Sequence, residues 1–324
     1  MREPRVALES AVLTHGLPYP LNLEVALALE EAVREEGATP KTIALVRGEV
    51  RVGLSPEEME ALAAGGAEKA SLWNLAALLA QGRSAGTTVA ATVHLAHLHG
   101  IPVFATGGIG GVHPEPYDES ADLVALSRTP ILVVSSGPKA ILDLRATLER
   151  LETLGVSVVG YRTDRLPAFF SPDSPFPVPA RVDTPMEAAR VYLRARALGL
   201  GGVLLVNPVS QGLPYEQVAL WVEEAGRMAA REGVFGKALT PYLLRKLSEL
   251  SSGETDRVNR RLLLENARLA ARVALALAGL EEACVRARRE AEGGAGASGA
   301  FPGRGGAAAR LEGGGPRGPG GVPL

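Results

Sequence analysis

The side chains that could do chemistry gather between Phe104 and Lys139. A short apolar run over residues 101–104 gives way to four glycines within residues 107–111, and a second apolar run over residues 131–134 leads to Lys139. Buried strands that end on glycines bring the backbone close to another group. Because ligands of parallel α/β sheets bind beyond the carboxyl ends of the strands, we expect a binding site in this stretch.

Lys139 is the most informative of these residues. It follows a predicted strand, stands on a Gly-Pro turn and opens a predicted helix over residues 140–154. The positive end of a helix and partial burial both favour the uncharged amine, and a free amine is a nucleophile toward aldehydes. A lysine that merely stands at a helix start is electrostatically unfavourable, so the sequence favours a functional Lys139.

Two further charged residues stand next to predicted elements. Glu9 comes directly after a predicted strand over residues 6–8, where a carboxylate is either solvated at the rim of the sheet or lines a site. Lys69 precedes a predicted helix over residues 73–81, and on its own a solvated lysine is the simpler interpretation. For both residues, the sequence is compatible with a functional role and with an ordinary surface position.

Thr87 and Thr88 precede a predicted helix of small residues. Two hydroxyls and free backbone N–H groups at a helix start can form an anion site, although threonine is also an ordinary helix cap. The glycines ahead of His113 lack the third glycine of the dinucleotide-binding fingerprint and run into a proline-containing loop. A Rossmann-type cofactor site is therefore not expected.

Acidic residues and histidines raise the question of a metal. Asp118, Glu119 and Asp122 are either solvated loop acids or ligands of a hard, partly hydrated ion such as Mg²⁺ or Mn²⁺. Three histidines between residues 94 and 99 have no acid partner nearby in the sequence, and we interpret them as a solvated helix face.

Strands and helices that alternate along the chain must position these side chains, which predicts an α/β protein. Asn22 is expected to cap a helix that ends at Gly37, and the proline-rich residues 171–179 are expected to form a covering loop. Asn266 stands inside the last predicted helix, where its side chain either lies on the surface or reaches a pocket.

Further strands are predicted at residues 42–46, 49–52, 156–161 and 203–206. Further helices are predicted at residues 183–198, 215–231 and 240–250, and two more begin near residues 55 and 255.

The composition limits the classes of function. With 34 lysines and arginines against 36 aspartates and glutamates over 324 residues, the chain has no basic stripe for a nucleic acid. It has no apolar run that predicts a membrane span or a signal peptide, so we expect a cytoplasmic protein. The single cysteine, Cys284, excludes an internal disulfide. Residues 1–292 are expected to form one domain, and the Gly/Ala/Arg/Pro-rich residues 293–324 a disordered tail.

The chain contains seven sequence blocks in order: ALES at 7–10, HGLPYP at 15–20, FATGGIGGVH at 104–113, SADL at 120–123, GPKAILD at 137–143, LPAFF at 166–170 and NP at 207–208. Together they resemble the pseudouridine-5′-phosphate glycosidase family, also called indigoidine synthase A-like, over residues 5–279. The resemblance implies a three-layer α/β/α sandwich with a mixed, mainly parallel sheet, a homotrimer and a Mn²⁺ requirement. It also implies reversible cleavage of the C–C glycosidic bond of pseudouridine 5′-phosphate to uracil and ribose 5-phosphate.

The resemblance assigns roles to single residues. It implies that Glu9 is the proton donor, that Lys139 forms a Schiff base with ring-opened ribose and that Asp118 holds the metal. A phosphate site is assigned to Thr87, Thr88 and the glycine loop. The residues implied to contact the substrate are Lys69, Thr88, Val89, Ser120, Ala121, Asp122 and Asn266.

Two other functions remain open at this point. The same sites suit another Schiff-base lyase or aldolase for sugar phosphates, which would act without uracil. A non-catalytic accessory subunit would keep the fold without turnover. The sequence departs from the family pattern at Arg83, around residues 85–86 and at Glu265, which leaves the phosphate geometry open but touches none of Glu9, Asp118 and Lys139.

Overall fold

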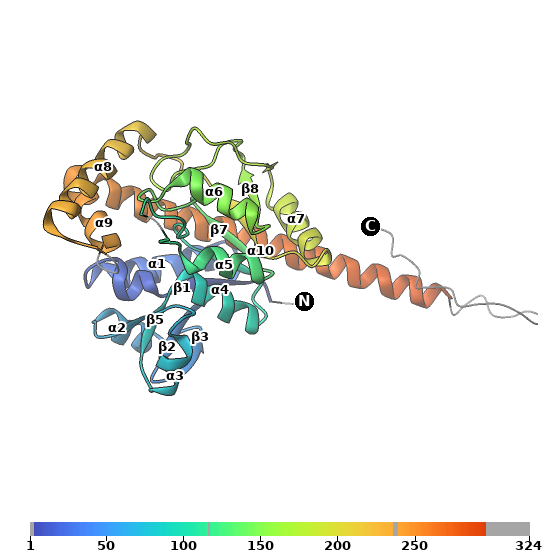
Figure 1. Ribbon diagram of the computed structural model, residues 1–324. Coiled ribbons are helices and arrows are strands. Elements are labelled where there is room, and N and C mark those ends of the chain that lie inside the picture. Colours follow the sequence, from blue (N-terminus) through green and yellow to red (C-terminus); the bar gives the residue numbers. More distant parts are fainter. Residues whose placement is uncertain (1–2, 116, 236–238, 296–324) are drawn as a thin grey trace, which may run out of the picture. The chain divides into compact units, whose positions relative to one another are not determined.

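A computed structural model describes residues 3–115, 117–235 and 239–295 (Figure 1). Its described strands form one mixed sheet in the order β4-β5-β2-β1-β6-β7-β10-β8-β9, with β3 paired to β2. Seven strand pairs are parallel, and the β2–β3 and β2–β5 pairs are antiparallel. The strands are β1 (Arg5–Glu9), β2 (Thr39–Val46), β3 (Glu49–Val52), β4 (Glu68–Ala70), β5 (Ala85–Thr87), β6 (Val103–Ala105), β7 (Leu132–Ser135), β8 (Ser157–Tyr161), β9 (Arg181–Val182) and β10 (Val203–Val206).

Helices cover both faces of this sheet. They are a short π-helix, η1 (Val12–Gly16), and the α-helices α1 (Leu21–Glu35), α2 (Pro56–Ala63), α3 (Leu75–Ala80), α4 (Val89–Leu98), α5 (Ala121–Arg128), α6 (Leu144–Thr153), α7 (Pro185–Ala197), α8 (Tyr215–Glu232), α9 (Leu239–Leu250) and α10 (Glu254–Ala295). One apolar core lies between the sheet and α1, α7, α8, α9 and α10, and a second lies between the sheet and α3, α4, α5 and α6. The predicted α/β/α sandwich with a mainly parallel sheet is confirmed.

The central strands are apolar on both faces because each face packs against helices. In β1, Val6 and Leu8 enter the first core while Ala7 enters the second. In β6, Phe104 enters the second core while its two neighbours enter the first. This alternation explains why the sequence shows short, continuous apolar runs and no polar face in the central strands.

The register of the parallel strands brings their carboxyl ends to one edge. Leu8 pairs with Ala105, Ala105 with Val134, and Ser135 with Val206. The residues that follow β1, β6, β7 and β10 therefore lie side by side, although they come from four distant parts of the sequence. This edge is the one at which the sequence predicted a site.

Two local predictions were wrong. Asn22 does not cap α1, because the helix begins at Leu21 and Asn22 lies buried inside it. Its side-chain amide donates hydrogen bonds to the carbonyls of Leu13 (2.6 Å) and Ala63 (3.0 Å) and so ties α1 to η1 and α2. Asparagine near a helix start is often a cap, but the hydrogen bonds of Asn22 to other helices place it inside α1.

The helix predicted to begin at Lys139 begins later. α6 starts at Leu144, with the Asp143 carboxylate as the cap that accepts a hydrogen bond from the Ala146 N–H (2.9 Å). Residues 137–143 form an irregular segment of bends, a turn and isolated bridges instead. The helix start therefore lies away from Lys139, and the argument that the helix dipole acts on this lysine does not hold.

The contacts divide the chain into two compact units, Met1–Glu282 and Ala283–Leu324. The described part of the second unit is the helical stretch up to Ala295. Most of the predicted tail, residues 296–324, lies outside the described residues. None of the described helices has a stretch long and apolar enough to cross a membrane.

Candidate active site

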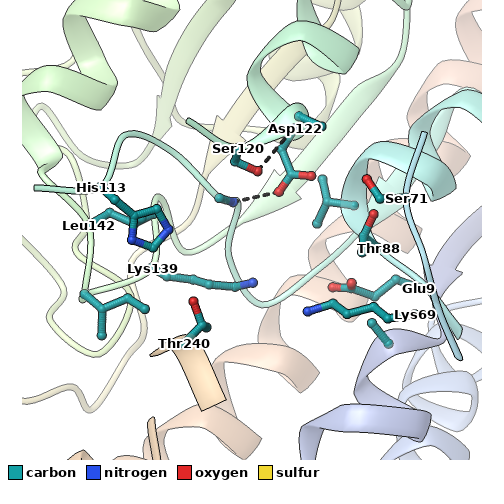
Figure 2. Close-up of a pocket in the computed structure, with 15 residues that line it drawn as sticks. Glu9, Lys69, Ser71, Thr88, His113, Ser120, Asp122, Lys139, Leu142 and Thr240 are labelled. Carbon is teal, nitrogen blue, oxygen red and sulfur yellow. Dashed lines mark hydrogen bonds between the residues drawn. The ribbon is translucent and has the colours of Figure 1, made fainter. Parts of the chain in front are cut away.

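A cavity of about 180 Å³ opens at the carboxyl edge of the sheet (Figure 2). An adjoining hollow of about 650 Å³ lies toward the solvent. The inner cavity is lined by Glu9, Ala11, Lys69, Ser71, Thr88, Val89, Gly110, His113, Ser120, Ala121, Asp122, Lys139, Ile141, Leu142 and Thr240. The two spaces share Lys69, Ser71, Thr88, His113, Ser120 and Thr240, so they form one continuous site.

Glu9 is placed in the cavity by the last position of β1. Its carboxylate accepts a short hydrogen bond from the Thr106 hydroxyl, which follows β6. Burial raises the pKa of Glu9, against the opposing effects of the Lys139 charge and the Thr106 hydrogen bond. A carboxyl group in these surroundings retains its proton more readily and can act as a general acid.

Lys139 enters the same cavity from the turn after β7. Its N–H donates to the Ile109 carbonyl (3.0 Å), and the Ile109 N–H donates to the Gly137 carbonyl (3.1 Å), so this turn is bonded to the glycine loop. Gly137 has φ +84°, and a Cβ there would lie 2.1 Å from the Pro167 carbonyl oxygen. The turn therefore requires glycine two residues before the lysine, and the lysine stands on a fixed backbone.

Lys69 lies on the opposite side of the cavity. It belongs to β4, where sequence reasoning expected the approach to a helix. Figure 2 shows the Lys69 and Lys139 side chains extending toward each other, with the Glu9 carboxyl beside Lys69. Burial and the charge of Lys139 lower the pKa of Lys69, while Glu9 and Asp122 oppose this shift. The site thus holds two lysine side chains and a carboxyl group within electrostatic reach of one another.

Asp122 lines the cavity but uses both carboxylate oxygens elsewhere. One oxygen accepts from the Ala90 N–H at the start of α4 (2.9 Å), and the other from the Gly110 N–H of the glycine loop (2.8 Å). A carboxylate at the positive end of a helix is stabilised there. Asp122 therefore occupies the α4 N-terminus and fixes the loop relative to the helix.

Of the phosphate site predicted at Thr87, Thr88 and the glycine loop, the part at Thr87 is wrong. The Thr87 hydroxyl is buried and donates to the Ile43 carbonyl (2.7 Å). A Cβ at Gly110 would lie 2.3 Å from the Ser120 hydroxyl, so this glycine allows close packing. Thr88 does line the cavity, although its hydroxyl also caps α4 through the Ala91 N–H (3.4 Å).

The other residues predicted to contact substrate fall into two groups. Val89, Ser120 and Ala121 line the cavity together with Thr88. Asn266 is fully buried beneath the site and lines neither the cavity nor the outer hollow. Its amide is bonded to strand ends, so its position differs from that of a substrate contact.

Asp118 lines the outer hollow, exposed to solvent, with its carbonyl accepting from the His113 N–H (2.9 Å). Across residues 3–115, 117–235 and 239–295, no three His, Cys, Asp or Glu side chains come together as a metal site. A single exposed carboxylate fits a hard ion that retains most of its water, as Mn²⁺ can, and does not fit a fully protein-ligated ion.

Three polar residues in or next to the cavity escaped sequence reasoning. Thr106 is bonded to Glu9, Ser71 lines the wall near Lys69, and Thr240 enters from α9. A polar residue directly after a buried strand was the available signal for Thr106. Thr240 carried no signal, because only the packing of α9 against the rest of the fold brings it to the cavity.

Comparison with known proteins identifies relatives. Residues 1–276 match the family model described as indigoidine synthase A like protein. A pseudouridine-5′-phosphate glycosidase of Paracoccus denitrificans is 52% identical over 86% of this chain and 94% of its own length. One of Petrotoga mobilis is 49% identical over 84% of this chain and 91% of its own length.

Solved structures agree with these relatives. An indigoidine synthase A-like protein of Thermotoga maritima superposes with a TM-score of 0.78 and 38% identity over 84% of this chain and 92% of its own. The prealnumycin C-glycosynthase AlnA, solved in complex with ribulose 5-phosphate, gives a TM-score of 0.80 and 39% identity over 86% of this chain and 93% of its own. The chain therefore belongs to the indigoidine synthase A-like family, the family of these pseudouridine-5′-phosphate glycosidases.

Proposed function

We propose that the chain is a pseudouridine-5′-phosphate glycosidase that reversibly cleaves the substrate to uracil and ribose 5-phosphate through a Schiff base on Lys139. The observation that carries this proposal is the meeting of Glu9, with its raised pKa, and Lys139 in one cavity. The names of relatives about half identical to this chain, and the sugar phosphate bound by a structural neighbour, support the substrate.

The bond to be broken explains why an acid and an amine are needed together. A base leaves an N-glycoside when it is protonated, whereas the carbon of a C–C glycoside has no lone pair to accept that proton. The electrons must instead be drawn toward the sugar. An amine that becomes an imine on C1′ provides this driving force.

The proposed reaction has three steps. Glu9 gives its proton to the ring oxygen as the C1′–oxygen bond breaks, and the Lys139 amine forms a bond to C1′. The C1′–C5 bond then breaks, its electrons remain on the pyrimidine C5, which takes the proton that Nζ gives up, and a protonated imine forms between C1′ and Nζ. Water hydrolyses this imine, which releases ribose 5-phosphate and the free Lys139 amine and returns a proton to Glu9.

The remaining side chains bind and orient the substrate. With the N–H groups of Ala90 and Gly110 bonded to Asp122, the cation available to the phosphate is Lys69, with the Ser71 hydroxyl on the same wall. Val89, Ala121, Ile141 and Leu142 offer apolar surface to the sugar and base. Asp118 would hold Mn²⁺ in the outer hollow, and the bound ion would supply positive charge and ordered water there.

A mass-spectrometric assay tests the function. Purified protein with Mn²⁺ is given pseudouridine 5′-phosphate in one reaction, and uracil with ribose 5-phosphate in another. Interconversion in both tubes supports the proposal. Borohydride reduction during turnover should add the mass of the reduced sugar phosphate to a peptide that contains Lys139.

The same assay separates the alternatives. An aldolase-type lyase would form the borohydride adduct with ribose 5-phosphate yet leave uracil and pseudouridine 5′-phosphate unchanged. An accessory subunit would give neither result while folded and supplied with metal. Sedimentation of the same sample tests the expected homotrimer.

A further inference from the structure

Asn266 of α10 joins the ends of three parallel strands. Its amide nitrogen donates to the Thr106 carbonyl after β6 (2.9 Å) and to the Ser136 hydroxyl after β7 (3.1 Å). Its amide oxygen accepts from the Asn207 side chain after β10 (3.0 Å). Asn266 is fully buried, so these bonds are not weakened by competing water.

Thr106 is the link between this amide and Glu9. Its N–H donates to the Val134 carbonyl (3.0 Å), its carbonyl accepts from Asn266, and its hydroxyl donates to Oε1 of Glu9. The side chain is buried, with 3% of the residue exposed. The backbone of Thr106 is therefore held on both sides, which fixes the direction of its hydroxyl.

We propose that Thr106 and Asn266 are positioning residues for Glu9, with Thr106 orienting the carboxyl group and Asn266 holding Thr106 in register with the turn that carries Lys139. Because the Thr106 hydroxyl donates to Oε1, the transferable proton of Glu9 lies on Oε2. This inference rests on the proposed role of Glu9 as the acid. It assigns to Asn266 a supporting position beneath the site in place of a substrate contact.

The charges around Glu9 set the expected pH dependence. Glu9 lies within electrostatic reach of Lys139 and Lys69, which lower its pKa, and of Asp122, which raises it, and His113 lines the same cavity. The Thr106 hydrogen bond also lowers the pKa of Glu9. Without that bond, the effect of burial is less opposed, so Glu9 should titrate at higher pH.

Thr106→Val tests the inference, because valine has nearly the shape of threonine and lacks the hydroxyl. We expect kcat for cleavage to fall by about 10- to 100-fold, with KM nearly unchanged, as for a misaligned catalytic group. The alkaline limb of the kcat/KM profile should move to higher pH. Thr106→Ser retains the hydroxyl and should restore both kcat and the pH profile.

Three further variants separate positioning from general damage. Thr153→Val removes an exposed hydroxyl on α6 and should leave kcat and the pH profile unchanged. In the Glu9→Gln background, Thr106→Val should cause little further loss, because it acts through Glu9. Asn266→Ala should lower kcat without adding to the effect of Thr106→Val, provided that its melting curve remains cooperative.

A measurement without substrate distinguishes this inference from the proposed function. The carboxyl signal of Glu9 in ¹³C-glutamate-labelled protein is identified by its loss in Glu9→Gln, and its titration should shift upward in Thr106→Val. A folded wild type that does not cleave pseudouridine 5′-phosphate would overturn the function and leave the titration result standing. An unshifted Glu9 titration in Thr106→Val, or an equal loss of kcat in both backgrounds, would overturn the positioning role.

Discussion

At the scale of single residues, the clearest expectation concerns Lys139. Lys139→Ala removes the nucleophile while leaving the turn backbone in place, so cleavage should fall by about 1,000-fold or more. Borohydride should no longer attach a sugar phosphate to the protein. Lys246→Ala, which removes a partly buried lysine of α9 that is paired with Glu249 (2.7 Å), should change neither result. Retained cleavage in a folded Lys139→Ala protein would exclude the Schiff base.

Glu9 should affect stability in a pH-dependent way. Burial raises its folded-state pKa above the unfolded value, so the stabilisation from its bound proton is fully present below the unfolded pKa and is lost as the pH rises through the folded pKa. Glutamine has no such proton to lose. The melting temperature of Glu9→Gln should therefore be close to that of wild type at about pH 4. It should exceed the wild-type melting temperature by an increasing margin as the pH rises toward about pH 8.

Differential scanning calorimetry across this pH range checks the prediction. A difference in melting temperature between Glu9→Gln and wild type that stays constant with pH would contradict it. The same variant should cleave much more slowly than wild type while keeping a measurable residual rate, which would make Glu9 a residue whose function costs stability.

Sequence reasoning placed the reactive residues better than their supports. The sequence placed Glu9 and Lys139 at or just beyond predicted strand ends, and the parallel sheet brings these two ends to one edge. Asn266 could not be placed, because its location depends on how α10 packs beneath three strand ends. Thr106 stood in a recognised sequence block, but only the register of β1 and β6 shows that it faces Glu9.

At the scale of elements, Asp122 should matter for stability. Asp122→Asn replaces one N–H acceptor by an amide donor, so the Ala90 or the Gly110 N–H loses its partner inside the protein. We expect a loss of about 1–3 kcal/mol in the free energy of unfolding, measured in urea. Asp143→Asn is the matched control, because asparagine caps a helix about as well as aspartate and Asp143 is an exposed cap of α6.

If Asp122→Asn and Asp143→Asn lower the free energy of unfolding equally, Asp122 is an ordinary helix cap. A larger effect at Asp122 together with reduced cleavage would show that α4 and the glycine loop are held in place through one side chain. Both outcomes can be read from the same denaturation series.

The element boundaries that sequence reasoning missed have a common cause. α6 was placed too early because Lys139 follows a Gly-Pro turn, yet the chain makes further turns up to Asp143 before a cap forms. Lys69 was expected before a helix, whereas the short strand β4 pairs with β5. Such short segments owe their conformation to neighbouring strands, and local propensity does not encode those neighbours.

At the scale of the whole molecule, the central strands should control cooperative unfolding. Phe104 is fully buried in β6, between β1 and β7. Phe104→Ala should reduce the free energy of unfolding by about 3–5 kcal/mol, because it leaves a cavity in a close-packed layer. Leu198→Ala, at a position 60% exposed, should change it by about 0.5 kcal/mol or less.

Urea denaturation monitored by circular dichroism compares these two variants. Similar losses would mean that the layer around Phe104 can collapse onto the space left by the ring. The alternating elements of the sequence predict an α/β protein, but they do not predict which strands are central. The antiparallel pairing of β5 with β2 likewise depends on contacts between distant segments.

The position of Asn266 has a consequence for how the protein is made. Glu9, Thr106 and Lys139 leave the ribosome long before Asn266, which follows Glu9 by about 250 residues, or roughly 10 to 50 seconds of synthesis. Until α10 emerges, the strand ends have their backbone bonds but lack the side-chain bonds of Asn266, so a nascent chain carries its lysine amine without a fully aligned acid. Cleavage activity should therefore arise near the end of translation, and chains interrupted before residue 266 should not release free uracil.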